Sequence, residues 1–427
     1  MFRFITLFFI LVIPIFAFND SIIIKADRML DVENGKIVES SVLVIEKGYI
    51  QAINPKKLPQ SPKIIDLGDV TLLPGLIDCH THLSLGLDLA NTWKWDLSYV
   101  KNDAGMIALI ANQNGQKMLM KGFTTIRELA SIHQADINLQ KIEALNPKYY
   151  PIPRIIPSGY ALSVRGGHLD FSSRFIQRLK NGAKEGVIRN DLDLTTAVRE
   201  QYARGARFIK IAVTGGILSR GTSLGAHFSL REIKIIVDEA KKYGIKTASH
   251  AHTRQGIENA ILAGVASIEH GSTLDEELIT LMKEKGTFLV PTTYALDVIY
   301  QRKDKMPPVY RKKLEMIYQL AKKSHKLAIA HKVKIAFGTD TGVFPYEDAV
   351  KEFSALVNLG MEEVEVIRAA TIYAAELLGV EDRGKIKPGL LADMIAVKGN
   401  PLKNIEFMEN AVFVMKGGTV YKNTVEK

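Results

Sequence analysis

Eight short apolar runs alternate with helix-like patterns between residues 75 and 385, and this alternation restricts the fold more than any other feature. The runs have the length and composition of buried strands, and amphipathic stretches such as 230–243 separate them. Parallel strands need crossover connections, and these are right-handed. Eight such units predict an α/β fold with a closed (β/α)8 barrel, or TIM barrel, rather than an open doubly wound sheet, because no G-x-G-x-x-G follows the first run. The runs are 76–77, 124–126, 154–156, 208–213, 246–249, 266–268, 287–290 and 334–337.

Both ends of the chain have a different sequence pattern, in which short strand-like runs are separated by turn residues. Runs lie within 22–65 and again within 394–421, and Asn34-Gly35 is typical of a hairpin turn. We therefore expect a small β-sandwich domain formed from both chain ends, with 18–74 and 386–427 flanking the barrel at 75–385.

The composition is that of a soluble globular protein, with 47% hydrophobic and 24% charged residues. The formal net charge is +10, but lysine and arginine are scattered and form no basic block interleaved with aromatic residues. We therefore expect no nucleic-acid binding. The single cysteine, Cys79, cannot form an internal disulfide, so it gives no indication of the redox compartment.

Residues 1–17 have the pattern of a signal peptide. Arg3 supplies a positive charge, residues 5–18 carry none, and this apolar stretch is too short to span a bilayer. Ala17 is a plausible cleavage site, although Ile15 occupies a position where a small residue is usual. We expect export to a bacterial periplasm or secretion, with no stable membrane span after cleavage; a retained membrane anchor is the competing interpretation.

His80 and His82 follow the first apolar run of the barrel. Residues two apart in a strand point to the same face, so both imidazoles can reach one metal ion. An isolated pair of this kind also arises by chance. Whether this pair indicates a metal site depends on the residues at the ends of the other predicted strands.

Four further residues have positions at or near the carboxyl ends of later strands, where a barrel carries its reactive groups. Each alone has an ordinary explanation: a hydrogen-bonded core histidine, a helix cap, or a buried lysine paired with a carboxylate. Together with the first pair they predict a metal site. The four are Lys210, His250, His270 and Asp340.

Nitrogen and oxygen donors without thiolates suit Zn²⁺, with Mn²⁺, Co²⁺ or Fe²⁺ as alternatives. An ammonium group cannot coordinate, but carbamylation by CO2 would turn Lys210 into a carboxylate able to bridge two ions. His80, His82 and Asp340 would then hold one ion, and His250 and His270 the other. Two such ions lower the pKa of a bridging water and polarise a carbonyl, and Asp340 could pass the proton to the leaving amine.

Several motifs in combination resemble the metal-dependent amidohydrolase superfamily over about residues 22–422. The resemblance implies the barrel, a binuclear site and carboxylation of Lys210. The motifs, besides Lys210 itself, are Leu73-Pro74-Gly75-Leu76-Ile77-Asp78-Cys79-His80-Thr81-His82, Ser249-His250-Ala251-His252, Glu269-His270-Gly271, Gly338-Thr339-Asp340 and the segment 387–394.

The stretches 166–170, 214–219 and 289–292 resemble the Xaa-Pro dipeptidase (prolidase-like), carboxypeptidase and ochratoxin-hydrolysing branch. That branch cleaves amide bonds of dipeptides and N-acyl amino acids, so we expect a hydrolase of such a small-molecule substrate. His168-Leu169-Asp170 stands where close relatives often have His-Gly-Asp. The alternatives are a cyclic-amide hydrolase or deaminase similar to imidazolonepropionase, and a non-catalytic metal-binding scaffold. The bridging lysine argues against the former, and the complete ligand set argues against the latter.

Three residues are candidates for contact with substrate. His168, behind two glycines, could bind the scissile carbonyl or a substrate carboxylate and is also a candidate catalytic residue; Arg220 could bind a carboxylate, and Tyr294 could line the pocket. His252 shares the strand face of His250, and we interpret it as a neighbour of the ligands. The loop 85–99, with Trp93 and Trp95, is a candidate lid. The sequence predicts no particular oligomeric state, and a homo-oligomer is one of the alternatives.

Overall fold

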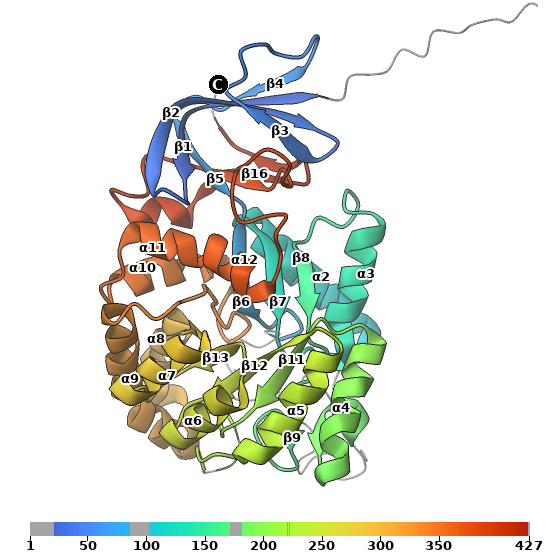
Figure 1. Cartoon of the computed structure of the whole chain (residues 1–427), viewed down its shortest axis with the longest axis vertical. Coiled ribbons are helices and arrows are strands. Elements are labelled where there is room, and N and C mark those ends of the chain that lie inside the picture. Colours follow the sequence, from blue (N-terminus) through green and yellow to red (C-terminus); the bar gives the residue numbers. More distant parts are fainter. Residues whose placement is uncertain (1–20, 86–101, 171–181, 220, 222, 426–427) are drawn as a thin grey trace, which may run out of the picture.

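The computed structural model describes residues 21–85, 102–170, 182–219, 221 and 223–425. A (β/α)8 barrel forms the larger part, and a β-sheet domain lies at one end of it (Figure 1). The predicted signal peptide and the tryptophans of the predicted lid lie outside the described residues. Within those residues, no helix has both the length and the apolar character needed to cross a membrane.

The barrel strands run parallel in two groups that join into a closed ring. One group has the order β6-β7-β8 and the other β11-β12-β13-β14. A bridge between Leu162 and Ile211 joins the groups on one side. Their bounds are β6 (Leu76–Thr81), β7 (Phe123–Glu128), β8 (Arg154–Pro157), β11 (Phe208–Ala212), β12 (Lys246–Ala251), β13 (Ser267–His270) and β14 (Phe288–Val290).

The eighth strand position is filled by residues 334–337, which pair too briefly to form a regular strand. Ile335 forms a bridge with Leu289 of β14. On the other side, the Cys79 amide of β6 donates to the Phe337 carbonyl at 2.8 Å. These bonds close the ring between the seventh and first strands, so the barrel predicted from eight alternating units is confirmed.

Helices cover the outside of the barrel, and several begin at the caps that the sequence indicates. At α5, the Ser229 hydroxyl accepts from the Glu232 amide, and the Glu232 carboxylate accepts from the Ser229 amide in return. The helices are α2 (Ala104–Met120), α3 (Ala135–Leu145), α4 (Asp191–Arg204), α5 (Leu230–Lys242), α6 (Arg254–Ala263), α7 (Glu276–Lys285), α8 (Thr293–Gln301), α9 (Pro308–Ala330), α10 (Lys351–Val357), α11 (Glu363–Ala369) and α12 (Ile372–Leu378).

The second domain is a sheet of eight strands drawn from both chain ends, as the sequence predicts. Its order is β17-β16-β15-β5-β1-β2-β3, with β4 paired to β1. The antiparallel pair β5–β15 joins the N-terminal half to the C-terminal half. The strands are β1 (Ile22–Asp31), β2 (Lys36–Glu46), β3 (Tyr49–Ile53), β4 (Lys63–Asp66), β5 (Val70–Pro74), β15 (Met394–Lys398), β16 (Ala411–Lys416) and β17 (Thr419–Asn423); a separate small sheet pairs β9 (Ser163–Val164) with β10 (Val187–Ile188).

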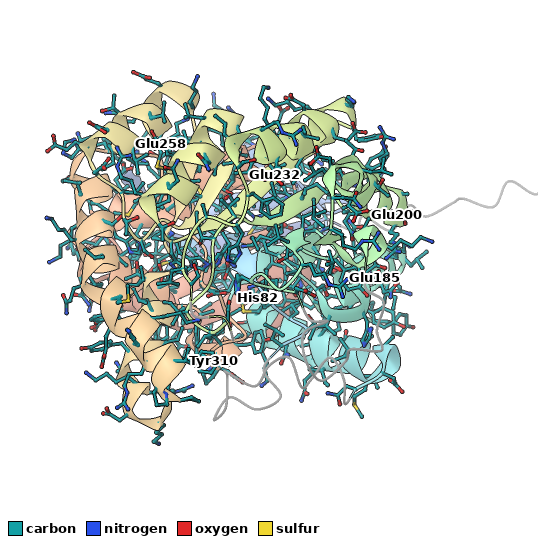
Figure 2. The ribbon with its side chains drawn as sticks, turned by 90° about the horizontal axis from the view of Figure 1, so that it is seen from below. His82, Glu185, Glu200, Glu232, Glu258 and Tyr310 are labelled. Carbon is teal, nitrogen blue, oxygen red and sulfur yellow. The ribbon has the colours of Figure 1, made fainter. Side chains whose placement is uncertain are left out.

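The connection between the domains sets the direction of the barrel. Only Gly75 separates β5 of the sheet domain from β6, so β6 runs away from that domain. The carboxyl ends of all the parallel strands therefore lie at the far end of the barrel. Seen from that end, His82 lies near the centre of the ring of helices (Figure 2).

A buried ion pair fastens the sheet domain to the barrel. The Lys416 ammonium of β16 donates to the Glu143 carboxylate of α3 and to the Ile152 carbonyl, each at 2.6 Å. The side chains of Lys416 and Glu143 are 1% and 10% exposed. Removal of one partner of a buried pair leaves the other charge without compensation.

We expect Lys416→Met to lower the free energy of unfolding by about 3 kcal/mol, because Glu143 is then buried without its partner. The matched control is Lys234→Met, which removes an exposed pair with Asp238 on α5 and is expected to cost less than about 0.5 kcal/mol. Urea unfolding of both variants at equal metal concentration measures the difference. Equal decreases in the free energy of unfolding would show that the Lys416–Glu143 pair stabilises the protein no more than an exposed pair does.

Candidate metal centre

The first group of donors comes from the two segments that close the barrel. His80 and His82 lie at the end of β6, and Asp340 follows residues 334–337. Asp340 Oδ1 lies 3.1 Å from His82 Nε2 and 3.5 Å from His80 Nε2. The Asp340 amide donates to the His80 carbonyl at 2.8 Å, which fixes the carboxylate opposite the two imidazoles. Asp340 has a left-handed backbone with φ 58°, a strained conformation that is frequent at functional sites. The ligand atoms of all three residues lie within 4.8 Å of one another.

The second group comes from the carboxyl ends of β12 and β13. Its members are His250, His252 and His270, whose ligand atoms also lie within 4.8 Å of one another. The His250 and His270 ring centroids are 4.6 Å apart, and those of His252 and His270 are 5.0 Å apart. His252 therefore offers a donor to this group, although we placed it outside the ligand set from the sequence.

Lys210 of β11 is buried among these imidazoles. Its side chain is 1% exposed, and among the described residues its Nζ has no hydrogen-bond partner. Burial lowers the pKa of His80, His250 and His270, and the charge of Lys210 lowers it further in each. Burial likewise lowers the pKa of Lys210 to about 8. A buried ammonium without a partner is costly, so this position favours a neutral or modified amine.

A buried ion pair that we did not predict from the sequence supports the first group. Glu269 accepts from Arg127 Nη2 and from His80 Nδ1, each at 2.8 Å, and all three side chains are at most 1% exposed. Burial alone would raise the pKa of Glu269, but Arg127 and the hydrogen bond from His80 lower it to about 2. Arg127 and Glu269 each place a charge in a fully buried stretch of a short strand, β7 and β13, but no local pattern in the sequence pairs them.

Hydrogen bonds at Nδ1 orient several of the imidazoles. His80 uses Nδ1 for Glu269, His252 for the Ser272 hydroxyl at 2.8 Å, and His270 for the Thr292 hydroxyl at 2.8 Å. This arrangement leaves Nε2 of each ring for a metal. Burial also lowers the pKa of His80 to about 4 and that of His252 to about 3. The imidazoles are therefore neutral at pH 7, as metal ligands must be.

These observations fit two divalent cations. Two groups of buried nitrogen and oxygen donors lie close together, since the His80 and His270 ring centroids are 5.2 Å apart. The Lys210 nitrogen, which has no hydrogen-bond partner in the described part of the chain, lies among them. The donors contain no thiolate, and this chemistry suits Zn²⁺ and similar ions.

The three substrate candidates have different surroundings. His168 lies beside the second group, with its ring centroid 4.1 Å from that of His250, and its Nδ1 is 2.6 Å from the Ser219 hydroxyl. Tyr294 packs edge-on against Phe344 at 5.0 Å. Its pocket role stays a prediction. Arg220 lies outside the described residues.

We expect Glu269→Gln to weaken metal binding about 10- to 100-fold, because the amide no longer supplies the charge that orients and polarises His80. Competition with a chelator measures the affinity, and circular dichroism checks the fold. Glu376→Gln is the control, because this half-exposed carboxylate pairs with Lys334 on the protein surface. Unchanged metal affinity in Glu269→Gln would contradict the role of Glu269 in orienting His80.

Comparison with known proteins agrees with this geometry. The family model of the amidohydrolase family matches residues 71–421, which include every predicted ligand. Ochratoxinase from Aspergillus niger is 31% identical over 415 residues, covering 91% of this chain and 84% of the relative.

Two solved structures are similar over most of the chain. A Xaa-Pro dipeptidase with methionine bound in its active site has a TM-score of 0.88 at 34% identity, covering 95% of this chain and all of the other. A prolidase in complex with N-methylphosphonate-L-proline has a TM-score of 0.84 at 30% identity, covering 94% and 100%. The superfamily and branch indicated by the motifs are confirmed: this chain belongs to the amidohydrolase family and is a hydrolase of amide C–N bonds.

Proposed function

We propose that this protein is a binuclear metal-dependent amidohydrolase that cleaves the peptide or N-acyl amide bond of a dipeptide or an N-acyl amino acid. The observation that carries the proposal is the buried Nζ of Lys210, which has no hydrogen-bond partner among the described residues and lies among two groups of metal donors. A structural lysine would have a carboxylate or carbonyl partner at that depth. A lysine that becomes a bridging ligand needs none before it is modified.

The surroundings of Lys210 favour its carboxylation. CO2 reacts with a neutral amine: the nitrogen attacks the carbon, an N–C bond forms and a proton is released. Burial lowers the pKa of Lys210 to about 8, so a much larger fraction of the amine is neutral near pH 8 than for an exposed lysine. The product is a carboxylate that could be shared between the two groups of donors.

The protein's own groups have separate tasks in the proposed reaction. His80, His82 and Asp340 could hold one divalent cation and His250 and His270 another, and bound cations would lower the pKa of the attacking water and polarise the amide carbonyl. Asp340, next to both His80 and His82, accepts the proton of the attacking water and delivers it to the leaving nitrogen. His168 lies beside the second group, where it can hydrogen-bond the scissile carbonyl or a substrate carboxylate.

The relatives favour the substrate class. The similar proteins include ones described as a Xaa-Pro dipeptidase, a prolidase with a bound proline phosphonate and an ochratoxinase. The alternative is a cyclic-amide hydrolase or deaminase. We further propose that residues 1–17 direct export to the periplasm or the outside of the cell.

We expect Lys210→Ala to lose activity and both metal ions together, because the bridging ligand is gone. Metal analysis and turnover are measured after reconstitution with Zn²⁺ and bicarbonate, and ¹³C-bicarbonate is expected to give a carbamate NMR signal in the wild type alone. The control is Lys246→Ala: this lysine, at the other end of the barrel, donates to the Glu376 and Leu377 carbonyls and should be dispensable for metal binding. Two ions retained in Lys210→Ala would refute the bridging role.

Substrate class is tested with a library of dipeptides and N-acyl amino acids, each with a free or an amidated terminal carboxylate. We expect turnover of the free acids and a loss of at least about 100-fold on amidation, since a buried polar site discriminates strongly against a missing partner. Turnover of cyclic amides with no dependence on a free carboxylate would favour the alternative function.

A further inference from the structure

Lys313 of α9 buries its ammonium group against the loop that follows β11. Nζ donates to the carbonyl oxygens of Gly216 at 2.9 Å, Ser219 at 2.6 Å and Gly221 at 2.9 Å. The residue is 2% exposed. An ammonium group has three donors, and each has a carbonyl acceptor here. Lys313 therefore holds three carbonyl groups of one loop at a single point.

The helix does not need a lysine at this position for its packing. The neighbours of Lys313 on α9 include Tyr310 and Leu314, which pack in an apolar cluster with Ile217 and Leu224 of the same loop region. Burial lowers the pKa of Lys313 to about 8, which reflects the cost of the charge. An apolar side chain would avoid that cost, so the lysine has a role beyond helix packing.

The loop that Lys313 holds forms one wall around His168. Ser219 Oγ lies 2.6 Å from His168 Nδ1 and accepts from the Gly216 amide at 3.1 Å. Gly216 packs so closely that a Cβ added there would lie 2.6 Å from His168 Cε1 and Nδ1. Two of the three residues bound by Lys313 therefore contact the His168 ring.

The same contacts keep His168 beside the candidate metal centre. Its ring centroid lies 4.1 Å from that of His250. Figure 2 shows Tyr310, one turn before Lys313 on α9, between the outer helices and His82 in this view of the face. We call the three hydrogen bonds from Lys313 to Gly216, Ser219 and Gly221 the Lys313 clamp. The clamp connects helix α9 of the outer layer to the loop that contacts His168.

We propose that Lys313 is a positioning residue: it fixes residues 214–219 in the shape in which Ser219 and Gly216 hold His168 for contact with substrate. Lys313 itself does not contact substrate. The inference rests on the proposed function only in that His168 binds the substrate.

The test compares Lys313→Met, which keeps the length and removes the three donors, with Lys312→Met, an exposed neighbour on the same helix. In the metal-loaded enzyme we expect kcat/KM to fall about 10- to 100-fold in Lys313→Met, as for loss of other orienting partners. Metal content should stay at the wild-type value, and Lys312→Met should behave as the wild type. Ser219→Ala, which keeps the clamp but removes its contact with His168, should show a similar loss.

A double-mutant cycle separates positioning from general damage. In a His168→Ala background, Lys313→Met should cost less than about twofold more, because both changes act on one contact. A full additional loss, or wild-type kinetics in Lys313→Met alone, would overturn the proposal.

A second readout does not depend on the substrate. In the ¹⁵N NMR spectrum of histidine-labelled protein, Lys313→Met should shift or broaden the His168 ring nitrogens, while the His80 signals stay unchanged. Unaltered His168 signals would overturn the positioning role even if a substrate were found. Altered signals in a protein that hydrolyses no amide would leave the clamp in place and refute only the proposed function.

Discussion

The hydrogen bonds that close the barrel between its first and last strand positions are the constraint on which the candidate metal centre depends. Cys79 donates to the Phe337 carbonyl, Asp340 to the His80 carbonyl and His82 to the Thr341 carbonyl. These bonds join segments that lie about 260 residues apart in the chain. Without this closure the His80–His82 pair would have no carboxylate opposite it. Closure of the barrel therefore brings together the donors of the first group.

Electrostatics then makes the enclosed space suitable for cations. Burial lowers the pKa of His80 and His270 and so favours their neutral forms, and Asp340 supplies a negative charge at the first group. Arg127 balances the charge of Glu269, and Glu269 orients His80 through Nδ1. Among the residues that the structure describes, the buried Nζ of Lys210 has no hydrogen-bond partner. Such a site suits cations, and the proposed carboxylation of Lys210 would replace its positive charge with a negative one.

The sequence predicted the parts that follow from local periodicity, and it missed the parts that depend on packing across the barrel. The two-residue spacing of His80 and His82 and the lysine inside the strand 208–212 indicated their positions directly. The pair Arg127–Glu269 spans 142 residues, and no local pattern predicts it. His252 illustrates the intermediate case: period two placed it on the correct face, but only the packing of β12 against β13 showed that it reaches the donors of His250 and His270.

The loops after the third and fourth strands show why a complete strand-end motif does not yet define a substrate site. His168 comes from one loop, its partner Ser219 from another, and the lysine that holds the second loop from helix α9. None of these residues lies on a barrel strand, so the strand pattern that fixes the metal donors leaves them free to vary. Selectivity in such a barrel depends on buried polar contacts such as the Lys313 clamp, whose charge is costly for folding and is retained where the shape of one loop matters.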